Sequence, residues 1–150
     1  MVPESTRHPM LAHLDQLVGH WETESTHPLL PAGTIVRGRA SFEWLEGGHF
    51  LIWRGSADHP DFPDAIAILG YDDAAGSGFM HSYDSRGKER RYVMTAEAGV
   101  WRFWADLPEF SQRFTGTVAA GNNTISGVSE LCQDGFTWQE DLVVTYRRLA

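Results

Sequence analysis

Beyond Gly19 the chain alternates apolar and polar residues in short segments, which is the pattern of β-strands that bury one face. Glycine-rich turn sequences such as Gly47-Gly48, Gly121-Asn122 and Asp134-Gly135 separate these segments. Because the segments follow one another through short turns, we expect an antiparallel up-and-down meander. The expected strands cover residues 20–26, 34–46, 49–57, 65–72, 78–84, 88–96, 100–106, 110–119, 123–133 and 136–148.

The stretch before Gly19 has a different period. Apolar residues recur near every 3.6 positions from Leu11 to Val18, with Pro9 at a permissible first position and Gly19 as a stop. The pattern therefore predicts one short N-terminal helix over residues 9–18. The fold class expected is all-β, an up-and-down antiparallel β-barrel of about ten strands with this helix at one end.

Length and cysteine content set further limits. A chain of 150 residues is expected to form a single domain, 1–150, and to bury about two thirds of its unfolded surface. Cys132 is the only cysteine, so a disulfide framework is excluded and a reducing, cytoplasmic location is expected.

Charge and hydropathy argue against two classes of partner. The sequence has 12 Lys and Arg against 20 Asp and Glu, and the resulting net charge of −8 repels a phosphate backbone. Neither a signal-peptide core nor an apolar run of membrane-spanning length is present in the sequence. We therefore expect no nucleic acid and no membrane among the partners.

The hairpin turns also predict which side chains share a face, because a slip of one residue would reverse the faces. A two-residue turn at 134–135 pairs Ser129 with Glu140, and a two-residue turn at 121–122 pairs Phe114 with the same Ser129. Two independent turns thus agree on the inner face of this strand.

The same reasoning extends the inner face along the chain. Turns at Pro108-Glu109 and Ala98-Gly99 continue it, and closing the 84–87 turn pairs His81 with Arg90. The polar residues expected inside are His81, Tyr83, Arg90, Tyr92, Gln112, Ser129 and Glu140. The aromatic residues expected around them include Trp53, Trp101, Phe103, Phe114 and Trp138.

Two strands near the N-terminus complete the prediction. The Gly47-Gly48 turn places Phe42 opposite Trp53 inside and leaves Ile52 outside. Strand 65–72 does not alternate clearly, so the pattern does not orient it.

Two short motifs resemble those of the lipocalin-like calycin barrels. Gly19-His20-Trp21 opens the first expected strand, and Tyr146-Arg147-Arg148 ends the last one. In that group a Gly-x-Trp opens the first strand, and its indole packs beneath the barrel against an arginine of the last strand. The resemblance implies that Trp21 packs on Arg148. It extends to fatty-acid-binding and nitrobindin-like barrels and to bacterial lipocalin-like proteins of unassigned function.

Cofactors and metals are not expected. The nitrobindin-like haem proteins carry a C-terminal proximal histidine, whereas no histidine follows His81 in this chain. A lone interior histidine lacks the further ligands that a metal site requires. The other histidines show no metal-ligand spacing and are expected at the surface.

Three functional hypotheses follow from the interior set. The first is binding of a small apolar or aromatic molecule whose acidic head group meets Arg90. The ligand-binding residues expected are His81, Tyr83, Arg90, Tyr92, Trp101, Phe103, Gln112, Phe114, Ser129, Trp138, Glu140 and Trp53.

The second hypothesis is a cofactor-free isomerase, cyclase or lyase in which Glu140, His81 and Tyr83 are catalytic. The third is a structural or interaction barrel without a small ligand, forming a homodimer through the outward Phe50 and Ile52. In a plainer alternative to all three, the interior polar groups form a closed network that only fixes the fold.

Overall fold

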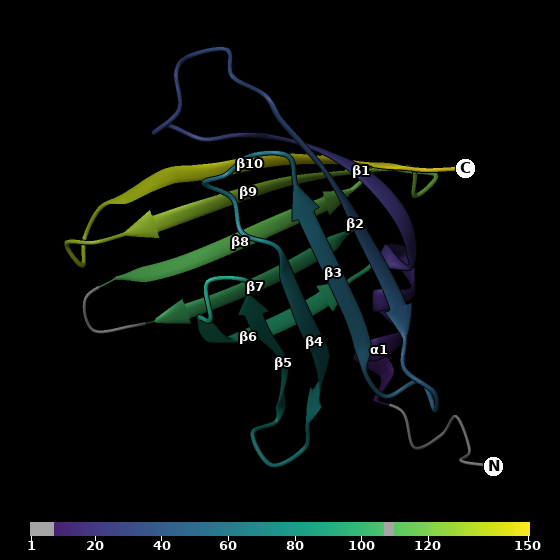
Figure 1. Ribbon diagram of the computed structural model, residues 1–150. Coiled ribbons are helices and arrows are strands. Elements are labelled where there is room, and N and C mark those ends of the chain that lie inside the picture. Colours follow the sequence, from purple (N-terminus) through teal and green to yellow (C-terminus); the bar gives the residue numbers. More distant parts are fainter. Residues whose placement is uncertain (1–7, 107–109) are drawn as a thin grey trace.

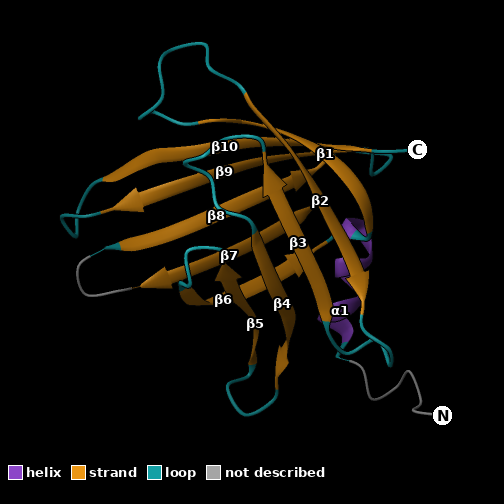
Figure 2. Ribbon diagram, in the orientation of Figure 1, coloured by secondary structure: helices purple, strands orange, loops and turns teal. Residues whose placement is uncertain are grey.

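The structure is a computed structural model that describes residues 8–106 and 110–150. Its strands form one closed antiparallel barrel in the order β1-β10-β9-β8-β7-β6-β5-β4-β3-β2 (Figures 1 and 2). The helical segments are α1 (Pro9–Ala12) and η2 (His13–Leu17). The strands are β1 (Gly19–Thr26), β2 (Val36–Trp44), β3 (Leu51–Ala57), β4 (Ala65–Asp72), β5 (Ser77–Asp84), β6 (Glu89–Glu97), β7 (Val100–Asp106), β8 (Ser111–Val118), β9 (Thr124–Cys132) and β10 (Trp138–Arg148).

Each strand pairs with its neighbour in sequence, and β1 pairs with β10 to close the barrel. The expected meander of ten strands with one short N-terminal helix is therefore confirmed. Closure leaves none of these ten strands with an unpaired edge. In Figure 1, β2–β4 run steeply across β7–β9, which lie behind them.

One end of the barrel is closed by the helical segment. Trp21 is fully buried there, and its indole N–H donates to the Leu17 carbonyl at 2.8 Å. The Arg148 guanidinium lies 4.1 Å from the Trp21 ring and donates to the carbonyls of Gln16 and Asn122 at 3.1 and 2.7 Å. The Trp21–Arg148 contact that the resemblance implies is thus present.

The core is built from the inner faces of the ten strands and from the helical segment. Its largest fully buried side chains are Trp21, Trp101, Phe42, Leu14, Leu17, Leu51, Leu69, Met80, Met94 and Ile125. On β4, Ala67 and Leu69 are buried, while Ile66 and Ile68 point outward. This settles the orientation of the strand that the sequence pattern left open.

Four of the predicted hairpin registers are confirmed. They are the pairs Phe42 with Trp53, Met94 with Phe103, Ala105 with Gln112, and Val118 with Ile125. The Pro108-Glu109 turn from which the third pair was inferred lies outside the described residues.

The predicted register between β5 and β6 is wrong by one residue. Asp84 pairs with Lys88 across a three-residue loop, in which Gly87 has a φ of 82°. A four-residue loop would have paired His81 with Arg90, but His81 lies opposite Arg91 and Ser82 lies opposite Arg90. His81 and Tyr83 therefore face outward, and Met80 and Ser82 face the interior.

The predicted register between β9 and β10 is also wrong. Trp138 pairs with Cys132, so the connection is a loop over 133–137 and not a two-residue turn. The register then shifts between Glu140 and Val143, which is a β-bulge. Because the bulge reverses the faces, Glu140 lies opposite Glu130 on the outside and is exposed.

Candidate functional site

A cavity of about 640 Å³ occupies the interior of the barrel at the end away from the helix. Its wall is built from inward positions of several strands, because the inner faces of β3 to β10 converge there. The apolar part of the wall includes Trp53, Met80, Phe103, Phe114 and Leu142. The Phe103 and Phe114 rings are stacked with centroids 4.7 Å apart, so they form one packed aromatic pair in the wall.

A polar cluster lies on the β6–β8 side of this cavity. Arg90 Nη1 donates to Gln112 Oε1 at 2.8 Å, and the Tyr92 hydroxyl donates to the same oxygen at 3.2 Å. Ser82 lies directly opposite Arg90 on β5. The cluster therefore has donors gathered around a single amide acceptor.

Arg90 differs from the other arginines that line the cavity. Arg86 is paired with Asp84 at 2.7 Å, and Arg113 is paired with Glu130 at 2.9 Å. Within residues 8–106 and 110–150, no carboxylate lies within 4.0 Å of Arg90, whose hydrogen bond goes to a neutral amide. Among the described residues, the half-buried guanidinium of Arg90 thus has no carboxylate within ion-pair distance.

Two neighbouring groups have shifted pKa values. Hydrogen bonding to Arg86 lowers the pKa of Asp84 to about 2, so this carboxylate stays ionised at the cavity mouth. Burial raises the pKa of Tyr92, and the nearby Arg90 opposes that shift. At neutral pH Tyr92 is therefore a neutral phenol that donates a hydrogen bond.

The cavity mouth is held by contacts between three segments. His27 Nε2 lies 2.7 Å from Asp141 Oδ1 of the β10 bulge, and the His27 ring contacts Phe62 edge-on with centroids 6.4 Å apart. His27 Nδ1 accepts from the Leu29 backbone N–H at 3.1 Å, so the proton is assigned to Nε2. His27, which was expected at the surface, thus lies at the rim of the cavity with 21% of its side chain exposed.

Seven of the predicted ligand-binding residues line the cavity. They are Trp53, Arg90, Tyr92, Phe103, Gln112, Phe114 and Ser129. Trp101 lies beneath them, fully buried against Phe103 and Phe114 with centroids 5.4 and 5.1 Å away.

The remaining predicted site residues do not line the cavity. Tyr83 points outward with 41% of its surface exposed, and His81 lies on the same outer face. Trp138 stacks with the exposed Arg113 at 3.8 Å, and Glu140 is exposed. Glu140, His81 and Tyr83, the expected catalytic set, therefore do not meet at one point.

Sequence reasoning missed several lining residues. Three of them, Met80, Ser82 and Asp84, lie in the hairpin that was correctly identified, but on the face opposite to the predicted one. The length of the loop after Asp84 would have identified them. Asp141 enters the mouth only because of the bulge.

Two further observations concern metals and membranes. In the part of the chain that the structure describes, no group of three or more His, Cys, Asp or Glu side chains is placed to hold a metal ion. No helix of these residues is long and apolar enough to span a bilayer.

Comparison with solved structures identifies the fold. Rv2717c from Mycobacterium tuberculosis superposes with a TM-score of 0.70 at 14% identity, over 96% of this chain and 99% of that one. Zebrafish ileal bile acid-binding protein, complexed with cholic acid, gives 0.54 at 14% identity over 89% and 99% of the two chains. The S-type phycobiliprotein lyase CPES from Guillardia theta gives 0.53 at 12% identity over 93% and 92%.

No family model matches the sequence, and no curated protein matches it. The superpositions and the closed ten-stranded barrel show that this chain has a lipocalin-like calycin fold. At these identities the likeness concerns the fold alone.

Proposed function

We propose that this protein binds a small, mainly apolar molecule with an acidic head group inside the barrel. The observation that carries the proposal is the half-buried Arg90 guanidinium, which has no carboxylate partner among the described residues and faces a cavity with a largely apolar wall. Partial burial of a cation is costly unless an anion is near, and a ligand carboxylate would supply that anion. Ser82 lies opposite Arg90 and would donate to the second carboxylate oxygen.

The cavity suits such a ligand in size and lining. About 640 Å³ is within the range of pockets that hold drug-sized molecules. The stacked Phe103 and Phe114 rings, with Trp53 and Met80, offer an apolar wall to the body of the ligand. The bile acid-binding protein of the same fold, complexed with cholic acid, supports an acid as the kind of ligand to test first.

The proposal is tested by titrating the purified protein with straight-chain, aromatic and polycyclic carboxylic acids while tryptophan fluorescence is followed. Trp53 lines the cavity and Trp101 lies beneath it, so interior binding is expected to change the emission. Each acid is compared with its methyl ester, which keeps the apolar body and removes the charge. Saturable binding of at least one acid, tighter than its ester, is expected. The absence of binding by every acid would contradict the proposal.

A further inference from the structure

The outer face of β3–β5 carries a group of apolar side chains, named here the outer patch. Its members are Phe50, Ile52, Ile66, Ile68, Phe79 and Tyr83. Phe50, Ile66 and Tyr83 are 39%, 37% and 41% exposed. Apolar side chains gathered on one sheet face mark an interaction surface more often than scattered ones do.

The outer patch is continuous. Ile52 lies opposite Ile68, and Ile66 lies opposite Tyr83 in the strand register. The Phe50 and Phe79 rings approach to 6.3 Å over Gly70, where an added Cβ would lie only 2.8 Å from Phe79. Gly70 thus allows the two rings to cover the sheet between them.

Charges flank the outer patch in a definite order. One row of outward residues runs in register across β2 to β6: Glu43, Ile52, Ile68, His81 and Arg91. The row has Glu43, paired with Arg54 of the same copy at 3.0 Å, at its β2 end, and apolar residues in the middle. At its other end it has His81 and Arg91, of which Arg91 is paired with Glu89 at 2.9 Å. The acidic side chain and the basic side chains therefore lie at opposite ends of the row.

Such a row is complementary to itself. Consider a two-fold axis that lies in the interface, parallel to the strands and between β3 and β4. Rotation by 180° about this axis reverses the order of the residues in the row. The rotation places Ile52 of one copy against Ile68 of the other, and Glu43 of one copy against His81 of the other. Arg91 follows His81 in the row. Each attractive pair occurs twice, because a two-fold interface repeats every contact.

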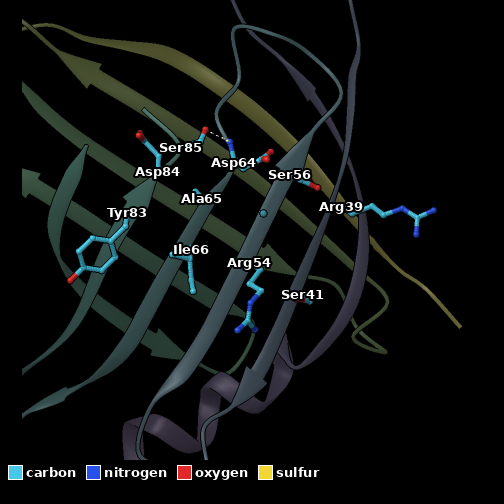
Figure 3. Close-up of a pocket in the computed structure, with 11 residues that line it drawn as sticks. Arg39, Ser41, Arg54, Ser56, Asp64, Ala65, Ile66, Tyr83, Asp84 and Ser85 are labelled. Atoms are coloured by element: carbon cyan, nitrogen blue, oxygen red, sulfur yellow. Dashed lines mark hydrogen bonds between the residues drawn. The ribbon is translucent and has the colours of Figure 1, made fainter. Parts of the chain in front are cut away.

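The adjacent row agrees with the same axis. The outward residues there are Ser41, Arg54, Ile66 and Tyr83. They line a hollow of about 520 Å³ on the outer surface, with Tyr83 on the side away from Ser41 and Arg39 (Figure 3). Rotation about the axis brings the exposed Tyr83 ring over the small Ser41 of the other copy, between Arg39 and Arg54, where cation–π contact is favourable.

From this self-complementary order of charges and apolar residues we infer that the outer patch binds a second copy of this chain, in a two-fold dimer of barrels packed through β3–β5. The inference is independent of the interior ligand, because the patch side chains point away from the cavity.

Sedimentation equilibrium over a range of protein concentrations tests the inference. The wild-type chain is expected to dimerise reversibly. Ile68→Lys is expected to weaken association by more than about 100-fold, because two isoleucines per dimer lose apolar burial and gain a charge. Phe136→Lys is the matched control, since Phe136 is a 90% exposed apolar residue of the β9–β10 loop and outside the patch. Circular dichroism and urea unfolding verify that each variant is folded.

A charge exchange tests the symmetry itself. Glu43→Lys and His81→Glu are each expected to weaken the dimer, and the double variant is expected to restore it, because the row is then reversed but still complementary. The lost Glu43–Arg54 pair, 3.0 Å long and exposed, contributes little to stability. A monomeric wild-type chain at all concentrations would overturn the inference. So would a dimer insensitive to Ile68→Lys, or a double variant no stronger than the single ones.

Discussion

The role of Arg90 leads to the sharpest prediction. Arg90→Met keeps an unbranched apolar side chain at this position and removes the guanidinium. In the proposed complex the guanidinium makes charge-assisted hydrogen bonds to the ligand carboxylate inside an apolar cavity. Hydrogen bonds to charged groups contribute about 1.5–3 kcal/mol each. We therefore expect the acid to lose about 2–3 kcal/mol of binding free energy, which is about 30- to 150-fold in Kd.

The free energy of unfolding is expected to change little. Arg90→Met removes the 2.8 Å bond to Gln112, but it also removes a half-buried charge that has no carboxylate partner among the described residues. These two effects oppose each other, so a net change within about 1 kcal/mol is expected. Weaker binding therefore cannot be attributed to unfolding, which urea denaturation verifies.

The assay is a fluorescence titration of wild type and variant with one acid and its methyl ester. Only the acid is expected to lose affinity. Arg91→Met is the matched control, because Arg91 is the next residue of β6 and faces outward, paired with Glu89 at 2.9 Å. An equal loss for acid and ester would refute the reasoning, and so would an equal effect of Arg91→Met.

Three further predictions concern the rest of the barrel. Glu140→Gln is expected to leave acid binding and stability unchanged to within about 0.5 kcal/mol, because the side chain is exposed on the outer face; a large loss of binding in the same titration would place it in the site after all. Arg148→Met is expected to cost about 2 kcal/mol in urea unfolding, because it removes the contact with Trp21 and the bonds to backbone carbonyls; an unchanged midpoint would show that this closure is dispensable. Asp84→Asn is expected to destabilise the protein above about pH 4, because the pKa of Asp84 is lowered from 3.8 to about 2 in the folded state. The difference in stability from wild type is expected to vanish as the pH falls from about 4 to 2. Urea unfolding at a series of pH values checks this, and a difference that persists at pH 2 would speak against the ion pair with Arg86.

The positions of the strands and much of the inner face could be predicted from the sequence, because one buried face imposes alternation on each strand. Where a hairpin connection was short and its length unambiguous, as between β8 and β9, the pairing of Val118 with Ile125 was correct. Arg90, Tyr92 and Gln112 were placed in the interior for this reason.

The errors arose where a loop or a strand contained one residue more or fewer than the predicted pairing assumed. The three-residue loop after Asp84 moved His81 outward, and the bulge beyond Glu140 reversed the start of β10. Alternation did not reveal the first error, because both faces of β5 carry apolar residues: Phe79 points out and Met80 points in. The mouth contact of His27 with Asp141 involves a loop and a bulge, neither of which has a periodic pattern to detect.

The central claim is that the interior cavity binds an acid through Arg90. A crystal structure of the protein with the carboxylic acid that binds best tests this most directly. We predict that the carboxylate lies within hydrogen-bond distance of the Arg90 guanidinium and that the apolar body lies against Phe103 and Phe114. An acid bound outside the barrel, or bound inside with its carboxylate away from Arg90, would contradict the claim.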